Sequence, residues 1–284
     1  MTHRPRNEAE LRAHIASVPM DGDIAARREG FVRLAGPQPV GELLELGGVP
    51  CRAIGTGPDL LWLHGGGYVF GSAQTHLMLA AALAKAGLRV ILPDYRLAPE
   101  HPWPAMLEDA LAVLGALGPV CVGGDSAGGH LALALARRKP CLGLALISPN
   151  TDRTGRSTTR QRGSDAMNDD ATDAWLGRIA LPGLPPDDPD ISPLGSDLSG
   201  LPPLHLELAG AEILLDDGLL LARAAALQGV DVSLHVTPGL FHLFPLWPDA
   251  VAQGAAALGR IAAFARAASE RNVGSAGTRS PLPG

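Results

Sequence analysis

The sequence predicts a domain of the α/β class, with a mostly parallel sheet covered by helices on both faces. Short apolar segments alternate with helical segments along most of the chain, which is the pattern of consecutive βαβ units. The chain has 284 residues and is 46% hydrophobic, so it can bury a sizeable core. A glycine-rich turn, residues 124–128, joins one apolar segment directly to a helical one. For a sheet of this kind, we expect the functional site at the carboxyl ends of the strands.

A polar helical region precedes the first strand. Its better helical segments are Ala9–Ser17 and Ile24–Leu34, and Gly36-Pro37 ends it. Because these helices come before any strand signal, we interpret residues 1–38 as an N-terminal cap segment added to the main domain.

The strands of the main domain are predicted from short apolar runs bounded by turn residues. Gly47-Gly48 joins the first two strands as a hairpin, whereas most later strands are separated by helices. The predicted strands are Val40–Leu46, Val49–Ile54, Leu60–Leu63, Arg89–Leu92, Val120–Val122, Leu142–Ile147, Leu204–Leu208 and Asp231–Val236. The predicted helices among them are Thr75–Ala86, Ala105–Leu117, Leu131–Ala136, Asp217–Leu227 and Pro248–Ala268.

One long stretch interrupts this alternation. Residues 151–199 are rich in Thr, Arg, Asp, Pro and Gly, with one predicted helix around Asp170–Ile179. A long irregular segment inside a compact domain is usually a lid or a binding loop, and its polar composition predicts a small contribution to the core. We therefore predict a cap insertion at 151–199, a core formed by residues 39–150 and 200–269, and a disordered tail at 270–284.

Composition and charge argue against several classes of protein. The formal net charge is −6 and no block of basic residues is present, which disfavours nucleic acid or an anionic membrane surface as a partner. We find no run of about 18 apolar residues that could span a bilayer, and no secretory signal. Cys51, Cys121 and Cys141 form neither a disulfide framework nor a metal motif. We expect a cytoplasmic protein without metal or cofactor, and a homodimer is compatible with the sequence.

The glycine-rich turn has the pattern of a nucleophile elbow. Gly124-Asp125-Ser126-Ala127-Gly128 matches Gly-x-Ser-x-Gly between a strand and a helix. The turn is so tight that the residues two before and two after the serine must lack bulky side chains. This geometry exposes the Ser126 hydroxyl and presents the N–H of Ala127 at the start of a helix. Because an ordinary glycine-rich turn has the same pattern, the chain must also supply a base, an acid and oxyanion donors.

His242 is the best candidate base among the nine histidines. A serine hydroxyl is a weak nucleophile until a base removes its proton, and histidine is the usual base because its pKa lies near neutrality. His242 follows the last predicted strand in the loop Pro238–Phe244, on the same edge of the sheet as Ser126. We therefore assign His242 as the base.

The acid is predicted between the serine and the histidine, because α/β-hydrolases follow the chain order Ser, acid, His. Three carboxylates follow the strand Leu204–Leu208: Glu212, Asp216 and Asp217. We choose Asp216 over the other two. The alternative for Asp216 and Asp217 is that they cap the next helix, which aspartate does well.

The remaining oxyanion donors are predicted in His64-Gly65-Gly66-Gly67, which matches an HGGG motif. Three glycines let the backbone approach a substrate oxygen without a Cβ in the way. We expect His64 to hold this loop by hydrogen bonds rather than to act as a base. Walker and dinucleotide-binding spacings are absent, which disfavours a phosphate-binding loop.

These residues resemble the α/β-hydrolases of the bacterial hormone-sensitive-lipase group, the family IV carboxylesterases. The resemblance runs from about residue 55 to about residue 265. Its most specific stretch, Asp94–Ala105, carries no predicted catalytic group and would not recur by chance. At Asn150 the chain departs from the family, which often has Trp there. The matching stretches are His64–Tyr68, Asp94–Ala105 (the most specific), Gly124–Gly129, Asp190–Leu194 and Gly200–Pro203.

The resemblance implies an α/β-hydrolase fold with an eight-stranded, mostly parallel sheet and a small helical cap. It implies a triad of Ser126, Asp216 and His242. It implies oxyanion donors at Gly66, Gly67 and Ala127. As substrate-binding residues we select Tyr68, Asn150, Trp175 and Phe241.

The expected function is hydrolysis of small esters with short acyl chains, through a covalent acyl-enzyme. Short chains are expected because the cap segment contains few large apolar side chains. A lactonase, amidase, acyltransferase or dehydratase acting on a secondary metabolite remains open, because a triad does not define the substrate. A non-catalytic binding module is disfavoured, because His242 is present whereas receptor relatives in this family have lost that histidine.

Overall fold

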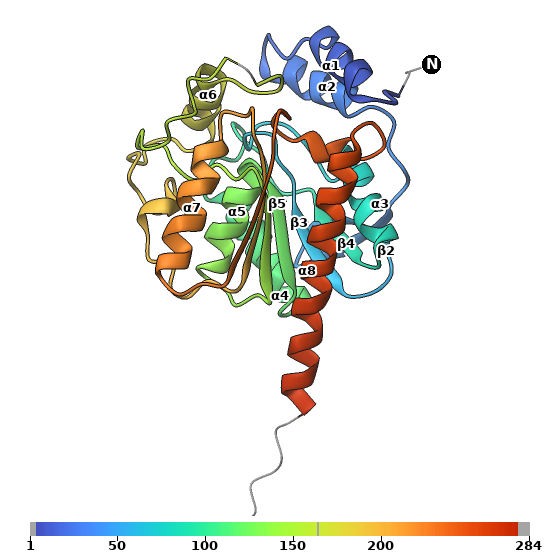
Figure 1. The fold of residues 1–284 in the computed structure, drawn as a ribbon, viewed down its shortest axis with the longest axis vertical. Helices are drawn as coiled ribbons and strands as arrows, with labels where there is room; N and C mark the ends of the chain where they lie inside the picture. The colour runs from blue at the N-terminus through green and yellow to red at the C-terminus, as the bar shows by residue number, and fades with distance from the viewer. Residues whose placement is uncertain (1–3, 164, 278–284) are drawn as a thin grey trace, which may run out of the picture.

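The computed structural model describes residues 4–163 and 165–277, and its strands coincide with the apolar runs of the sequence (Figure 1). Every predicted strand is present, with its ends shifted by at most a few residues. The strands are β1 (Glu42–Leu46), β2 (Val49–Gly55), β3 (Asp59–Leu63), β4 (Arg89–Pro93), β5 (Cys121–Asp125), β6 (Gly143–Ile147), β7 (Leu204–Ala209) and β8 (Val232–Thr237).

The strands form one eight-stranded sheet in the order β1-β2-β4-β3-β5-β6-β7-β8. β2 pairs antiparallel with both β1 and β4, and the remaining neighbours are parallel. β5 and β6 are buried along their whole length, as expected for central strands covered on both faces. The predicted eight-stranded, mostly parallel sheet is confirmed.

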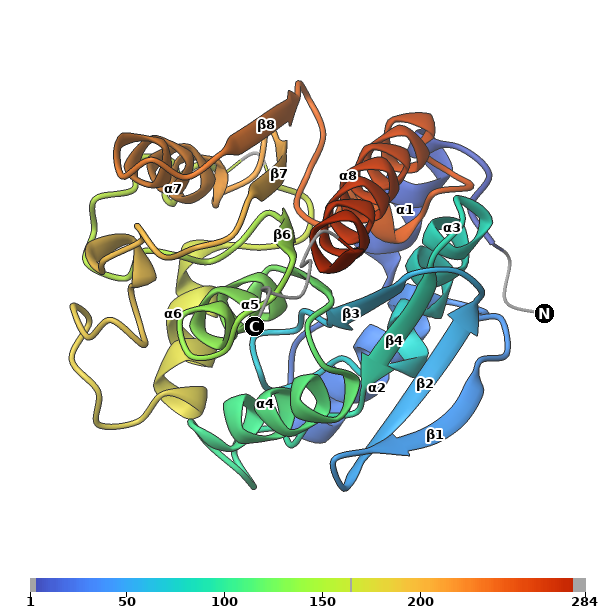
Figure 2. The ribbon, with the colours of Figure 1, turned by 90° about the horizontal axis from the view of Figure 1, so that it is seen from below.

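Helices cover both faces of the sheet (Figure 2). α3 (Leu77–Lys85) and α8 (Ala252–Gly277) pack together on one face, and α4 (Ala105–Leu117), α5 (Ala127–Ala136) and α7 (Leu215–Leu227) lie on the other. α8 packs through a stripe of apolar residues at helical spacing, which explains its stable position on the sheet. The buried residues of this stripe are Ala257, Leu258, Ile261, Ala262, Ala265 and Ala268.

The ends of two helices, α5 and α8, differ most from the sequence prediction. α5 begins at Ala127, four residues before the predicted start at Leu131, because the turn after β5 leads directly into the helix. α8 continues to Gly277, so residues 270–277, which the sequence places in a disordered tail, are helical. Residues 278–284 of that predicted tail lie outside the described residues.

Three further helices lie beyond the carboxyl ends of the parallel strands (Figure 1). α1 (Glu8–Ser17) and α2 (Ile24–Ala35) come from the N-terminal segment, and α6 (Asp170–Ala180) comes from the insertion. Arg28 of α2 donates to Glu100 and to the carbonyl of Val69, which ties this helix to the main domain. Two polypeptide segments far apart in sequence therefore cover the same edge of the sheet.

The insertion contributes more to the core than its polar composition suggests. Its apolar residues join the same hydrophobic cluster as the sheet, contrary to the expectation of a small contribution. The physical reason is spacing, because a few apolar residues at helical or turn positions suffice to bury one face of a polar segment. These buried residues include Leu176, Ala180, Leu181, Ile191 and Leu198. None of the described helices combines the length and apolar character needed to cross a membrane.

Candidate active site

Ser126 lies at the sharp turn between β5 and α5, with a left-handed φ of 54°. This backbone is held by the Ser126 N–H, which donates to the carbonyl of Ile147 on β6 at 2.9 Å. A Cβ on Gly124 would lie 2.4 Å from the carbonyl oxygen of Gly128, and one on Gly128 would lie 2.0 Å from that of Leu63. The two glycines that flank the serine are therefore required by close backbone approach, as the motif predicts.

His242 connects Ser126 to a carboxylate, and that carboxylate is Glu212. The His242 Nε2 atom lies 2.9 Å from Ser126 Oγ, and its Nδ1 atom lies 2.8 Å from Glu212 Oε2. All three side chains are buried: His242 is 3% exposed, Ser126 8% and Glu212 0%. The three residues form one continuous hydrogen-bonded chain, which is the geometry of a serine hydrolase triad.

The choice of Asp216 as the acid is wrong. Asp216 and Asp217 lie in the first turn of α7, which begins at Leu215. The Asp216 carboxylate accepts hydrogen bonds from the N–H and hydroxyl of Thr158, at 2.7 and 2.8 Å, whereas His242 is hydrogen-bonded to Glu212. Asp217 is also engaged elsewhere, by a buried arginine, Arg160. Asp216 and Asp217 lie too far along the chain to face His242, because both already belong to α7.

Glu212 reaches His242 because it lies in the short loop between β7 and α7, three residues after the last residue of β7. Its other oxygen, Oε1, accepts a hydrogen bond from the N–H of Ala209 at 2.8 Å, which fixes the direction of the carboxylate. The useful signal in the sequence was position rather than residue type. The acid belongs to the loop directly after the strand, and a glutamate there can serve as well as an aspartate.

Asp165 of the insertion accepts hydrogen bonds from the two loops that carry the acid and the base. The sequence did not predict this role. One of the Asp165 carboxylate oxygens accepts from the N–H of His242 at 3.1 Å, and the other accepts from the N–H of Ile213 at 3.2 Å. Ile213 follows Glu212 directly in the chain. The Asp165 carboxylate thus links the loop that carries Glu212 to the loop that carries His242.

Electrostatics favour the charged form of His242. Burial alone would lower its pKa, but the hydrogen bond and negative charge of Glu212 outweigh burial and raise the pKa of His242 above its usual value. Asp165 and Asp125 add smaller effects in the same direction. The surroundings of His242 therefore stabilise an imidazolium, the species that forms when a base takes the serine proton.

The HGGG loop lies beside the serine, and Asp125 fixes it there. The N–H of Gly65 donates to Asp125 Oδ2 at 2.9 Å, and Trp62 Nε1 donates to Asp125 Oδ1 at 2.9 Å. His76 Nε2 lies 3.2 Å from the same carboxylate. Burial alone would raise the pKa of Asp125, but His76 and its other partners hold it below its usual value. Asp125, adjacent to the serine in sequence, was not predicted to have this role.

The glycines of the loop have backbone conformations that other residues avoid. Gly66 has φ 115° and Gly67 has φ 59°, and both line the same cavity as Ser126. Ala127 is the first residue of α5, so its N–H has no acceptor within the helix. These are the expected positions of oxyanion donors, and the assignment of Gly66, Gly67 and Ala127 stays a prediction.

His64 is hydrogen-bonded within its own loop. Its Nδ1 atom lies 2.8 Å from the carbonyl oxygen of Gly65, and its ring stacks on Tyr95 at a centroid distance of 4.1 Å. Burial, together with the neighbouring His76, lowers the pKa of His64 to about 3. A neutral, hydrogen-bonded His64 agrees with the expectation that it supports the loop.

A cavity of about 430 Å³ opens over Ser126 and His242. Its walls come from three parts of the chain: the N-terminal helices, the HGGG loop and the cap. The N-terminal segment and the cap each contribute both apolar and polar groups. The apolar lining includes Ile15, Val18, Met20, Phe31, Leu34, Phe70, Met167 and Leu176, and the polar lining includes Asp21, Arg27, Asn168, Asp169, Thr172 and Asp173.

None of the four residues selected for substrate binding lines this cavity, so that selection is wrong. Tyr68 is buried and its hydroxyl is hydrogen-bonded to His130. Phe241 is fully buried beneath Arg12, and the ring of Trp175 lies against the guanidinium of Arg27. Asn150 is bonded to Asp173. These four residues were chosen because they are aromatic or lie next to a motif. Much of the cavity lining comes instead from the N-terminal helices.

Comparisons with known proteins agree with this fold. Residues 60–246 match a family described as having the alpha/beta hydrolase fold. An acetyl-hydrolase of Streptomyces hygroscopicus is 36% identical over 75% of this chain and 76% of its own length. An esterase of Acinetobacter venetianus is 34% identical over 72% and 73% of the two chains.

Solved structures are similar over most of the chain. A crystal structure of an esterase from the bacterial hormone-sensitive lipase family superposes with a TM-score of 0.84 at 35% identity, covering 91% of this chain and 96% of the other. A hormone-sensitive lipase from a metagenome library gives a TM-score of 0.82 at 32% identity, covering 91% and 95%. The fold and the site thus define an α/β-hydrolase. The chain belongs to the bacterial hormone-sensitive-lipase family of carboxylic ester hydrolases.

Proposed function

We propose that the protein hydrolyses short-chain carboxylic esters with Ser126 as nucleophile, His242 as base and Glu212 as the orienting acid. The observation that carries this proposal is the continuous chain from Ser126 Oγ through His242 to Glu212, at 2.9 and 2.8 Å, beside a cavity of about 430 Å³. The esterase and acetyl-hydrolase relatives support the same reaction class. The substrate is a small ester.

The reaction proceeds in two acyl transfers. His242 Nε2 takes the proton of Ser126 as Oγ attacks the ester carbonyl, and Glu212 stabilises the resulting imidazolium through Nδ1. The N–H groups of Gly66, Gly67 and Ala127 stabilise the oxyanion of the tetrahedral intermediate. His242 then protonates the leaving alkoxide. A water molecule, deprotonated by His242, attacks the acyl-enzyme in the same way and releases the carboxylic acid.

Asp125 contributes to this reaction by position. Because it accepts from Gly65 N and lies one residue before Ser126, it keeps the oxyanion loop and the nucleophile at a fixed separation. Pre-organised donors are effective because they need no reorganisation when charge develops on the substrate. We assign Asp125 as a positioning residue rather than a group that touches substrate.

The acyl preference should peak at short chains, about eight carbons or fewer, because each methylene buried in an apolar pocket contributes roughly 0.8 kcal/mol only until the pocket is full. Leu176, Phe31 and Leu34 line the cavity and are themselves buried, so they form a closed wall rather than an open apolar surface. We expect kcat/KM to rise from acetate, reach an early maximum and then fall.

The measurement is kcat/KM for p-nitrophenyl esters from acetate to palmitate, each below its aggregation limit, with Ser126→Ala protein as the background. A maximum at about twelve carbons or longer, or a jump in rate when the substrate forms an emulsion, would contradict a small-ester hydrolase, since a lipase binds its interface through a wide exposed apolar face.

The cytoplasmic location also remains a proposal. The three cysteines are free, and two of them, Cys51 and Cys121, are buried. Free thiols are the rule in a reducing compartment. The homodimer, and the lack of nucleic-acid and membrane partners, stay predictions from the sequence.

A further inference from the structure

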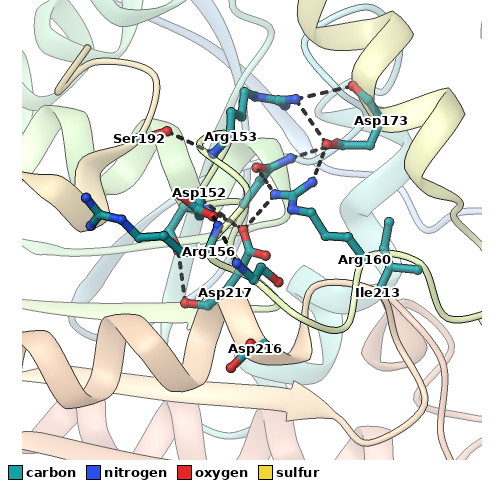
Figure 3. A network of polar contacts seen from close by, with 12 residues as sticks. Asp152, Arg153, Arg156, Arg160, Asp173, Ser192, Ile213, Asp216 and Asp217 are labelled. Carbon is teal, nitrogen blue, oxygen red and sulfur yellow. Dashed lines mark hydrogen bonds and ion pairs between the residues drawn. The ribbon is translucent and has the colours of Figure 1, made fainter. Parts of the chain in front are cut away.

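A cluster of buried charges joins the cap to the main domain between α6 and α7 (Figure 3). Arg160 lies at its centre, with its side chain only 10% exposed. Its Nη1 atom donates to Asp173 of α6 at 2.7 Å, and its Nη2 atom donates to Asp217 of α7 at 2.7 Å. One guanidinium thus bridges a carboxylate of the cap and a carboxylate of the core.

The main domain supplies further contacts to the same cluster. Asn150, which follows β6, accepts from Arg160 Nη2 at 2.9 Å and donates to Asp173 at 2.7 Å. Asp217 also accepts from the N–H groups of Thr151 and Asp152, at 3.0 and 2.9 Å. The cluster therefore fixes the start of the insertion, where the chain leaves the sheet, as well as α6.

The charges in this cluster are balanced only while the arginines are present. Asp173 is 4% exposed and pairs with Arg153 at 3.0 Å as well as with Arg160. Burial alone would raise the pKa of Asp173, but Arg153 and Arg160 together hold it below its usual value. Asp217 is fully buried, and burial raises its pKa above the usual value, an effect that the ion pair with Arg160 opposes. Removing Arg160 would leave a buried carboxylate on each side of the junction with less compensation.

The cluster is connected to the substrate cavity through one turn of helix. Asp173 and Leu176 are three residues apart on α6, so they lie on the same face, and both line the cavity over Ser126. Leu176 packs directly on the oxyanion loop, because a Cβ placed on Gly67 would lie 2.5 Å from a methyl carbon of Leu176. A shift of α6 would therefore move Leu176 relative to the predicted oxyanion donors of the HGGG loop.

We propose that Arg160 is a specificity-determining positioning residue, which fixes the height of Leu176 over Gly67 and so sets the acyl length that the cavity accepts. This inference rests on the proposed esterase function. It assigns no contact between Arg160 and substrate. Its effect passes through Asp173 and α6, and it would be absent if α6 held its position through apolar packing alone.

The test compares Arg160→Met with wild type. Methionine keeps the apolar stem and removes the guanidinium fork that holds both carboxylates. We expect kcat/KM for butyrate to fall about 10-fold or more, since small misplacements in a site can cost up to about 10²-fold. We also expect the preferred acyl chain to change by about two carbons. The matched control is Arg156→Met, because Arg156 lies on the same segment with an exposed side chain, and it should keep the wild-type profile.

A readout independent of activity is amide hydrogen exchange of residues 170–180 relative to those of α5. In Arg160→Met we expect α6 amides to exchange about 10-fold faster while α5 is unchanged, because local opening reports the stability of that helix alone. A variant that folds and keeps both the wild-type chain-length profile and the wild-type exchange would overturn the proposal. If the wild type lacked esterase activity, the proposed function would fail, but the exchange result would still decide whether Arg160 holds α6.

A second variant covers the case in which Arg160→Met does not fold. Arg160→Met with Asp217→Asn removes one cation and one buried carboxylate together, while Asp173 keeps Arg153. This charge-balanced variant should fold and still show the altered acyl preference and the faster exchange of α6. If neither variant accumulated as folded protein, Arg160 would be part of the scaffold, and its assignment as a device that sets specificity would be overturned.

Discussion

Replacing Ser126 with alanine is expected to lower kcat for ester hydrolysis by up to about 10⁶-fold, as the loss of a triad nucleophile does in a well-studied serine protease. The Oγ atom forms the acyl bond, and no neighbouring group can replace it at 2.9 Å from His242 Nε2 without moving the backbone. The fold should survive, because alanine occupies the same backbone conformation and removes one hydroxyl. Circular dichroism and thermal unfolding would establish that the variant is folded.

Ser148 offers a matched control for this substitution. It directly follows β6, next to the elbow strand, is fully buried, and also has a left-handed backbone, with φ 46°. Ser148→Ala should keep activity within about threefold of wild type, because the Ser148 hydroxyl has no hydrogen-bond partner among the described residues and its removal breaks no contact of this kind. Activity of a folded Ser126→Ala protein within about tenfold of wild type would show that the nucleophile lies elsewhere.

Replacing Glu212 with glutamine is expected to lower kcat by about 10⁴-fold, as the corresponding carboxylate-to-amide change does in the Ser-His-Asp triad. The geometry gives the reason. Glu212 Oε1 accepts from Ala209 N–H, so the glutamine oxygen would take that place and its NH₂ group would face His242 Nδ1. An NH₂ donor holds the imidazole in the tautomer whose proton lies on Nε2, and that tautomer cannot accept the proton of Ser126.

The control is Asp216→Asn, which should leave kcat within about threefold of wild type because the Asp216 carboxylate accepts hydrogen bonds from Thr158 instead of His242. The opposite ranking of the two variants would restore Asp216 as the acid. The acid limb of the pH profile provides an additional comparison. His242 must be neutral to act as a base, and its pKa is raised, so kcat/KM should fall as pH drops through that raised pKa. In Glu212→Gln the limb should move to lower pH.

The sequence predicts most of the fold because the central strands, β3 to β7, are buried on both faces. Such strands are nearly continuous apolar runs, and for that reason their ends can be placed within a few residues. The elbow is predictable for a similar reason. Gly124 and Gly128 leave no room for a Cβ, so the backbone geometry restricts the residue type at both positions. Ser126 and His242 then follow from their places after strand ends.

The acid and the cavity were harder to predict because each depends on contacts between distant segments. Glu212 and Asp216 are four residues apart, and only the start of α7 at Leu215 decides which of them faces His242. The cavity is lined by residues of α1 and α2, more than 90 positions before the nucleophile, and no local pattern connects them to it. Asp165 and Arg160 belong to an irregular, polar segment in which composition alone does not separate anchored charges from solvated ones.

The most direct test of the central assignment is covalent labelling of the wild-type protein with diethyl p-nitrophenyl phosphate, whose phosphorus is attacked by an activated serine with release of p-nitrophenolate. One p-nitrophenolate should be released per active protein molecule, with parallel loss of esterase activity. Peptide mass spectrometry should place the diethylphosphoryl group on Ser126, in the peptide that contains Gly124 and Gly128. Complete inactivation with the label on another residue, or with Ser126 unmodified, would contradict the account.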